Sequence, residues 1–308
     1  MSKPRKKRIR WIRVFTLLCV VVLVAGAGTY WYGRKGGEPV VVLATPTPTA
    51  LVTADAVATP SSTPTLAASA TPFAVQISVV KIALQKAISA HPELIVGASF
   101  IDLNTGTRTD VNGDRVFTAA STTKALIACL VLSQVEAGKH SLSDPLDGGT
   151  VKSHLQRMIN QSNNDSWMDL MQFIGYSYQI PYAKSIGITT YDFQNNRISP
   201  NDDALLLSKL YAGKLLNQAD TALLLSYMHD TNFDYLIPPA VPKGVKVFHK
   251  YGDYEDGLHD TAIIDDGKNP FVLTIYTNST SGGLGYEVRY PAFQEITKAV
   301  EEAMNVQL

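Results

Sequence analysis

The chain has 308 residues, of which 45% are hydrophobic and 18% charged, and 27 Lys and Arg balance 27 Asp and Glu. This composition is typical of globular proteins, and the length allows one or two domains with a substantial core. A net charge of zero argues against nucleic acid as the main partner. The two cysteines, Cys19 and Cys129, cannot build a disulfide framework, and we interpret both as small buried hydrophobic residues.

The N-terminal segment has the charge pattern of a membrane anchor. Residues 1–13 are strongly basic, and no charged residue then occurs over 14–33. About 20 apolar residues span a bilayer as a helix, and an excess of Lys and Arg marks the cytoplasmic side. We therefore expect a single-pass protein of the bacterial cell membrane, with a cytoplasmic segment, a transmembrane helix over 14–33 and an extracytoplasmic remainder. The alternative is secretion after cleavage of a signal peptide near Ala25-Gly-Ala27.

Residues 34–73 are rich in Pro, Thr and Ala and show no helical periodicity. This composition favours an extended, semi-rigid stalk that would hold a domain away from the membrane surface. The pattern changes at residue 74, and we expect a folded domain over residues 74–308.

The hydrophobic pattern of this domain predicts an α+β fold, with helices at both ends, two strands early and three late. Helices are expected over Gln76–Ala90, Ala125–Ala137, Val151–Gln161, Ser166–Phe173, Asp202–Leu216 and Pro291–Met304. Strands are expected over Leu94–Asp102, Thr107–Val111, Val245–Lys250, His259–Ile264 and Phe271–Thr277.

The first chemical motif is Ser121-Thr-Thr-Lys124, which opens the most apolar predicted helix. Side chains at i and i+3 of a helix share a face, so the amine of Lys124 can reach the hydroxyl. A serine hydroxyl needs such a base to become a nucleophile, and a lysine can serve when burial lowers its pKa. A second match, Ser78-Val-Val-Lys81, lies inside the first predicted helix without reactive neighbours. We therefore favour Ser121.

Two weaker motifs follow along the chain. Ser162-Asn-Asn164 lies at a predicted helix-to-loop junction, where its residues could act on a substrate or simply cap a helix. Ser199 belongs to another S-x-N match, but it precedes a helix, and we expect it to be an N-cap. Lys250-Tyr-Gly252 ends a predicted strand, where the lysine could hold an acidic group and the glycine would permit close backbone approach.

The order of the three motifs resembles that of class A β-lactamases and penicillin-binding proteins. The segment from Phe117 to Lys124 is similar to the active-site segment of that family, and the resemblance extends over most of residues 76–305. It implies a β-lactamase/transpeptidase-like fold, in which an antiparallel sheet is flanked by helices and joined to a helical subdomain. It implies neither a metal nor another cofactor.

The resemblance also implies roles for individual residues. Ser121 would be acylated with Lys124 as the base, and Ser162 would pass a proton to the leaving nitrogen. The remaining residues would bind the substrate. Asn164 would bind its amide, and Lys250, Tyr251 and Gly252 would bind its carboxylate end. The backbone N–H groups of Ser121 and Asp253 would bind the oxyanion.

The sequence departs from this family at three places. Asn163 stands where an aspartate is usual, and Tyr251 stands where a smaller hydroxyl residue helps to hold the carboxylate. No glutamate occurs between Glu136 and Glu255, so the glutamate that activates water in class A β-lactamases is missing. The nearby acids, Asp192, Asp202 and Asp203, are expected to serve in turns and helix caps.

Three functions follow from these observations. The first is a serine acyltransferase or hydrolase that acts on a β-lactam or a cell-wall peptide and releases the acyl group slowly. The second is a true β-lactamase with an unusual base for deacylation. The third is a catalytically silent surface-binding module on the same fold.

Overall fold

The computed structural model describes residues 72–305. The predicted basic segment, the predicted transmembrane helix and nearly all of the predicted stalk lie outside these residues. Pro72 and Phe73, the last two residues of the predicted stalk, instead begin the first helix. Among the helices of residues 72–305, none has the length and apolarity needed to cross a membrane.

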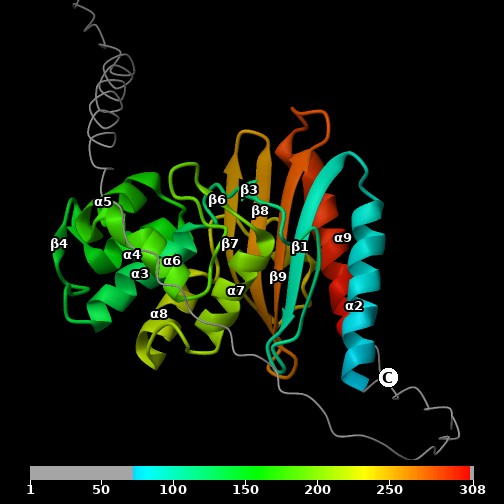
Figure 1. The fold of residues 1–308 in the computed structure, drawn as a ribbon, viewed down its shortest axis with the longest axis horizontal. Helices are drawn as coiled ribbons and strands as arrows, with labels where there is room; N and C mark the ends of the chain where they lie inside the picture. The colour runs from blue at the N-terminus through cyan, green and yellow to red at the C-terminus, as the bar shows by residue number, and fades with distance from the viewer. Residues whose placement is uncertain (1–71, 306–308) are drawn as a thin grey trace, which may run out of the picture. The chain divides into compact units, whose positions relative to one another are not determined.

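A five-stranded antiparallel sheet forms the centre of the domain, with the strand order β2-β1-β9-β8-β7 (Figure 1). Its strands are β1 (Leu94–Asp102), β2 (Arg108–Val111), β7 (Lys246–Tyr254), β8 (Gly257–Asp265) and β9 (Phe271–Ser279). The register of β7 with β8 is unbroken from Lys246 opposite Asp265 to Tyr254 opposite Gly257. Strand β7 lies at an edge of the sheet, so one side of its backbone is free of strand pairing.

The N-terminal and C-terminal helices cover one face of this sheet. Helix α2 (Pro72–Ser89) and helix α9 (Tyr286–Met304) lie side by side there and bury residues such as Leu84 and Phe293 against Phe100 of the sheet (Figure 1). Helix α9 begins five residues before its predicted start, with Pro291 inside it. Proline costs one backbone hydrogen bond close to the N-terminus, and burial of the apolar face of the helix offsets this cost.

A group of helices lies beyond the opposite face of the sheet (Figure 1). It comprises α3 (Lys124–Glu136), α4 (Val151–Asn160), α5 (Asn164–Ile174), α6 (Gln179–Ser185), α7 (Pro200–Tyr211) and α8 (Gln218–Tyr227). Helix α3 is buried along almost its whole length, as its uninterrupted apolar sequence predicts, and Cys129 is a free, fully buried thiol within it. Helix α7 ends at Tyr211, before its predicted end, and Gly213 follows with a φ of 63°.

Two very short strand pairs complete the described domain. The strands β4 (Pro145–Leu146) and β5 (Gly149–Thr150) form a tight hairpin before α4. The strand β3 (Phe117–Thr118) pairs with β6 (Arg197–Ile198), and thereby ties the segment before Ser121 to the chain before α7. This second pair positions the candidate site, yet neither of its strands is long enough to produce a periodic sequence signal.

Candidate active site

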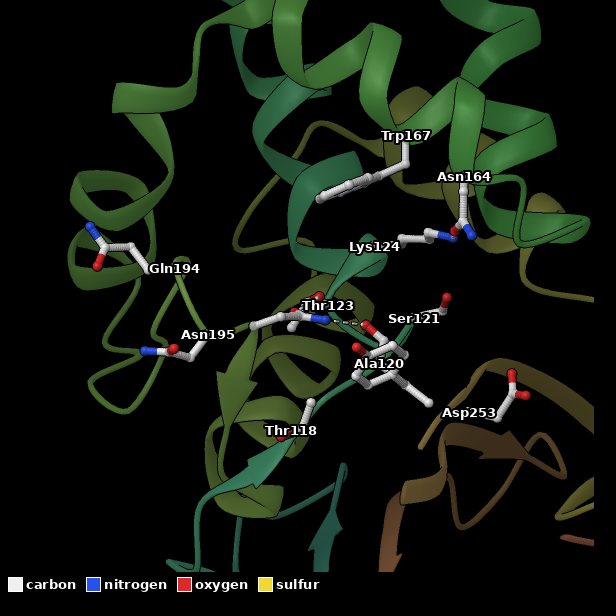
Figure 2. Close-up of a pocket in the computed structure, with 12 residues that line it drawn as sticks. Thr118, Ala120, Ser121, Thr123, Lys124, Asn164, Trp167, Gln194, Asn195 and Asp253 are labelled. Carbon is white, nitrogen blue, oxygen red and sulfur yellow. Dashed lines mark hydrogen bonds between the residues drawn. The ribbon is translucent and has the colours of Figure 1, made fainter. Parts of the chain in front are cut away.

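Ser121 lies in a tight turn between β3 and helix α3. Thr122 N–H donates to the carbonyl of Ala119 at 3.3 Å, and Lys124 N–H donates to the carbonyl of Ser121 at 3.2 Å. Ala120 has a φ of 53°, a left-handed conformation that costs a non-glycine residue free energy. The turn presents Ser121 in an open cleft at the beginning of α3 (Figure 2). Ser78 and Lys81, the second match to the motif, are instead exposed on α2.

A buried polar chain supports this turn from beneath. The hydroxyls of Thr122 and Tyr276 are hydrogen-bonded, and Tyr276 donates to Asp203 at 2.7 Å. Burial raises the pKa of Asp203 to about 6, against the opposing effect of its hydrogen bonds. Asp203 is therefore part of the support under the nucleophile, and not the helix cap that the sequence predicts.

Asn196 holds the turn from the other side, and sequence reasoning did not single it out. Its side chain donates to the carbonyl of Ala120 at 2.7 Å and accepts from the hydroxyl of Thr123 at 2.8 Å. Its own carbonyl accepts from Ala119 N–H at 2.7 Å. These three hydrogen bonds, to Ala119, Ala120 and Thr123, hold the turn on both sides of Ser121.

Lys124 is 4% exposed and points along the cleft toward the start of α5 (Figure 2). Its Nζ donates to the carbonyl of Ser162 at 2.7 Å and to Oδ1 of Asn164 at 2.6 Å. Burial lowers its pKa to about 8, an effect that the charge of Asp253 partly opposes. The hydroxyl of Ser121 has no hydrogen bond to another part of residues 72–305, so Lys124 is near the nucleophile but is not bonded to it.

Ser162 lies between the two lysines of the motifs. Its Oγ is 3.0 Å from Nζ of Lys250 and 3.5 Å from Nζ of Lys124. Its backbone is left-handed, with a φ of 53°, which directs its carbonyl toward Lys124. The fold therefore brings the lysines of the first and third motifs into contact with the serine of the second.

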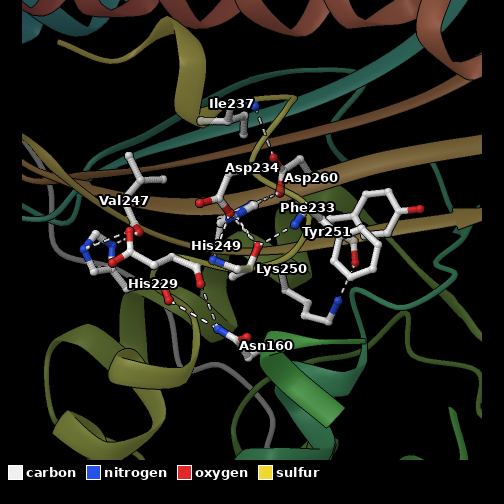
Figure 3. Close-up of polar contacts among 12 residues, drawn as sticks. Asn160, His229, Phe233, Asp234, Ile237, Val247, His249, Lys250, Tyr251 and Asp260 are labelled. Atoms are coloured by element: carbon white, nitrogen blue, oxygen red, sulfur yellow. Dashed lines mark hydrogen bonds and ion pairs between the residues drawn. The ribbon is translucent and has the colours of Figure 1, made fainter. Parts of the chain in front are cut away.

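Lys250 is 1% exposed and donates to the hydroxyl of Ser162 at 3.0 Å. It lies next to the rings of Phe233 and Tyr251 (Figure 3). Burial and, to a smaller extent, the positive charge of Lys124 lower its pKa to about 7, although the charges of Asp260 and Asp253 partly oppose this. A neighbouring network holds the same part of β7, because His249 contacts Asp260 at 2.8 Å and Asp234 at 2.9 Å.

Strand β7 approaches the Ser121 turn so closely that only glycine fits at position 252. A Cβ placed on Gly252 would lie 2.8 Å from the backbone nitrogen of Ser121 and 3.0 Å from the carbonyl oxygen of Ala119. The sequence predicts close backbone approach here, and the structure shows that the near neighbour is the nucleophile turn itself.

The same strand places a backbone donor beside Ser121. His249 N–H donates to the carbonyl of Met228 at 2.8 Å, so it points away from β8. Backbone groups alternate along a strand with a period of two, and the N–H groups of Tyr251 and Asp253 therefore face the same free edge. Ser121 N–H makes no hydrogen bond within residues 72–305. Ser121 and Asp253 thus offer two backbone donors on one cleft.

The other predicted binding residues occupy distinct positions. Asn164 is exposed in the cleft, and its neighbour Asn163 caps α5 by accepting from Ser166 N–H at 2.7 Å. The ring of Tyr251 does not line the cleft. It stacks on Phe233 at a centroid distance of 4.4 Å, and its hydroxyl donates to Asp253.

The cleft has a volume of about 340 Å³. It is lined by Thr118, Ala120, Ser121, Thr123, Lys124, Asn164, Trp167, Gln194, Asn195, Asn196, Asp253 and Tyr254. Asp253 is the one carboxylate in this lining. Asp192 accepts hydrogen bonds within its own turn, as the sequence predicts. Asp202 is not the turn or cap residue that the sequence predicts, because it accepts from Thr189 and Thr190, 12–13 residues earlier, while Ser199 caps α7.

Comparison with known proteins identifies the family. The model of the "Beta-lactamase enzyme family" matches residues 80–304. The chain belongs to this family. The serine hydrolase family that the motifs suggest is therefore confirmed, over the same part of the chain that the structure describes as one α+β domain.

Solved structures of this family have the same fold. A beta-lactamase from Xanthomonas campestris is 20% identical with a TM-score of 0.68, and the match covers 75% of this chain and 99% of that chain. A beta-lactamase from Chitinophaga pinensis is 21% identical with a TM-score of 0.67, covering 73% and 99%. A mutant of PBP-A, solved as an acyl-enzyme complex with penicillin G, is 22% identical with a TM-score of 0.64, covering 74% and 96%.

Proposed function

We propose that Ser121 attacks an amide carbonyl, in a β-lactam or a cell-wall peptide, and forms an acyl-enzyme that is released slowly. The observation that carries this proposal is the contact of Lys124, Ser162 and Lys250 beside an accessible Ser121. Lys124 in its neutral form accepts the hydroxyl proton as the Ser121 oxygen bonds to the carbonyl carbon. The backbone N–H groups of Ser121 and Asp253 stabilise the oxyanion.

Breakdown of the tetrahedral intermediate requires a proton on the leaving nitrogen. Ser162 Oγ lies within reach of both lysine ammonium groups, and it donates its proton to the nitrogen as a lysine replaces that proton. The amide C–N bond then breaks, and the acyl group remains on Ser121. The peptide carbonyl stays oriented by the side-chain amide of Asn164.

Slow release follows from the side chains that face the cleft. Hydrolysis of the ester on Ser121 needs a base that takes a proton from water. The turn over residues 191–198 contributes only the amides Gln194, Asn195 and Asn196 to the cleft lining. We expect penicillin to add its mass to the protein and to persist, as followed by intact-protein mass spectrometry over time. Absence of any adduct on Ser121 with penicillin or another serine probe would refute the proposal.

A β-lactamase with an unusual base is a second candidate, supported by the carboxylate of Asp253 in the cleft lining. In that case Asp253 takes the proton from water, and repeated turnover of a chromogenic cephalosporin is expected. A single burst that matches the protein concentration excludes this candidate. An Asp253→Asn variant separates the two functions, because it changes turnover into a persistent acyl-enzyme only if Asp253 is the base. Under the first function the acyl-enzyme persists with or without the substitution.

We further propose that the domain works outside the cytoplasm, tethered by residues 14–33. The support is the charge-free apolar run that follows a basic segment. A reporter fused after residue 40 tests both orientation and cleavage. Periplasmic-type reporter activity in a membrane fraction is expected, whereas cytoplasmic reporter activity contradicts the proposal, and a shortened secreted product indicates signal cleavage.

A further inference from the structure

A second hollow adjoins the Ser121 cleft, and two arginines line it. Its volume is about 560 Å³, and Thr118, Asn195 and Tyr254 line both it and the cleft. The two spaces therefore adjoin along β3, and we call them together the groove. We call the part lined by Arg115 and Arg197 the arginine hollow.

The fold itself brings these two side chains to one place. Arg197 begins β6 and is paired with Thr118 of β3, whereas Arg115 lies just before β3. Both arginines are exposed. The guanidinium carbon of Arg115 lies 5.5 Å from the ring centroid of Phe117. Stacking on a ring occupies the face of a guanidinium and leaves its N–H edges free to donate.

Neither guanidinium is neutralised by an ion pair within residues 72–305. Asp256 also lines the hollow, but its carboxylate is bound by Arg289 at 2.6 Å and by Ser279 at 2.8 Å. Asp192 interacts with Arg197 electrostatically, and its oxygens already accept hydrogen bonds from the turn that it begins. The hollow therefore offers two positive charges with unused donors.

We propose that the arginine hollow binds a carboxylate that the substrate carries at a distance from the amide attacked by Ser121. Two guanidinium groups match the planar, bidentate geometry of a carboxylate. Because the hollow adjoins the Ser121 cleft, one extended molecule can place its anion at the arginines and its amide at Ser121, so the substrate class is an acidic peptide. This identification of the substrate rests on the proposed function of Ser121, whereas binding of the carboxylate does not require acylation.

The test measures binding without chemistry. The full chain with Ser121→Ala, in detergent, is titrated with acetyl-capped tripeptide amides that carry glutamate or glutamine at the first, second or third position. We expect at least one glutamate peptide to bind about tenfold more tightly than its glutamine partner. The additional pair Arg115→Gln and Arg197→Gln should abolish this difference. The control pair Arg108→Gln and Lys152→Gln removes two exposed positive charges outside the groove. This pair should preserve the difference in affinity between glutamate and glutamine peptides.

Three results would overturn the inference: equal binding of every glutamate and glutamine pair, no binding of any peptide, or a preference that survives loss of both arginines. Unchanged thermal melting of the arginine variants shows that they fold. Penicillin labelling of the chain with Ser121 intact is a separate measurement. Its failure removes the proposed acylation, while a glutamate preference that depends on the arginines still establishes the anion site.

Discussion

At the scale of single residues, the two lysines of the site have opposite requirements. Lys124 must be neutral to act as a base, whereas Lys250 must be charged to attract an anion. Burial lowers the pKa of Lys124 to about 8 and that of Lys250 to about 7. Most molecules therefore lose the charge on Lys250 before Lys124 becomes neutral, and only a small fraction has both in the productive state at any pH.

This order of the two lysine pKa values predicts how the acylation rate depends on pH. For an uncharged ester or amide, the acylation rate should rise about tenfold per pH unit up to roughly pH 8 and then level off, because only Lys124 must lose its proton. For an anionic penicillin, the rate should pass through a maximum between about pH 7 and pH 8. Stopped acylation assays across pH 5.5–10 would measure both profiles. A flat profile for both substrates would contradict the role of Lys124.

Asp253 places a negative charge beside the nucleophile, and its removal should favour anionic substrates. Its charge also raises the pKa of Lys124, so Asp253→Asn should make that lysine a base at lower pH. Each effect is of the order of 1 kcal/mol, but loss of this charge also lowers the pKa of Lys250 and so weakens its attraction for an anion. We therefore expect acylation by penicillin to accelerate by a net factor of about five to ten. The gain should shrink at high salt. Rate constants for penicillin and an uncharged ester, at low and high salt, separate the two effects.

At the scale of elements, the pairing of β3 with β6 determines the shape of the nucleophile turn. Asn196 joins this pair to the turn through three hydrogen bonds. Replacing it by alanine leaves the carbonyl of Ala120 and the hydroxyl of Thr123 without their partner. We expect Asn196→Ala to slow acylation about 10–100-fold and to destabilise the domain by about 1–3 kcal/mol.

The matched control for this prediction is Asn104→Ala. That side chain makes one exposed hydrogen bond, to the carbonyl of Lys268 at 2.9 Å, outside the cleft lining. Acylation rates within about twofold of the unmodified protein are expected for the control. Equal effects of the two substitutions on acylation would show that Asn196 does not position Ser121.

The elements also show what sequence patterns can and cannot predict. Strand β1 matches its predicted bounds, Leu94–Asp102, because a long apolar run is bounded by turn residues. The sequence pattern does not predict helix α8 (Gln218–Tyr227), although Asn217 caps this helix by accepting from Asp220 N–H at 2.9 Å. Strands β3 and β6 have two residues each, too few for any periodicity.

Some residues of the candidate site can likewise be predicted from the sequence, and others cannot. Ser121, Lys124, Ser162 and Lys250 could be assembled in advance, because each belongs to a short motif with a chemical reason. Asn196 could not, because its role depends on contacts with residues more than 70 positions earlier in the chain. The position of Tyr251 could not be predicted either, since its ring packs on Phe233 from a loop without any motif.

At the scale of the whole domain, the site lies where two hydrophobic cores meet. Helix α3 and its surrounding helices form one core with one face of the sheet, while α2 and α9 form the other with the opposite face. Strand β7 takes part in both, because alternate residues such as Phe248 and Val247 point to opposite faces. Conditions that weaken the attachment of β7 should therefore reduce both stability and acylation.

High pH is such a condition, because it removes the charge of His249, which contacts Asp234 and Asp260. Burial alone would lower the pKa of His249, but Asp260 and Asp234 outweigh it and raise the pKa to about 9. A pKa above the unfolded value near 6.5 means that the folded state holds the proton more tightly. The contribution to stability is therefore complete below about pH 6.5 and is lost as the pH rises through about 9. Its upper limit is about 3 kcal/mol.

The two lysines contribute to stability with the opposite pH dependence to His249. The contribution of His249 is therefore measured as the difference in stability between the unmodified protein and His249→Gln. Lowered pKa values of Lys124 and Lys250 make the domain more stable as the pH rises above about 7, in both proteins alike. The difference in unfolding free energy between the two proteins should be largest at pH 6 and should shrink toward pH 9.5. A difference that stays constant over this range would show that His249 does not carry the charge that holds β7 in place.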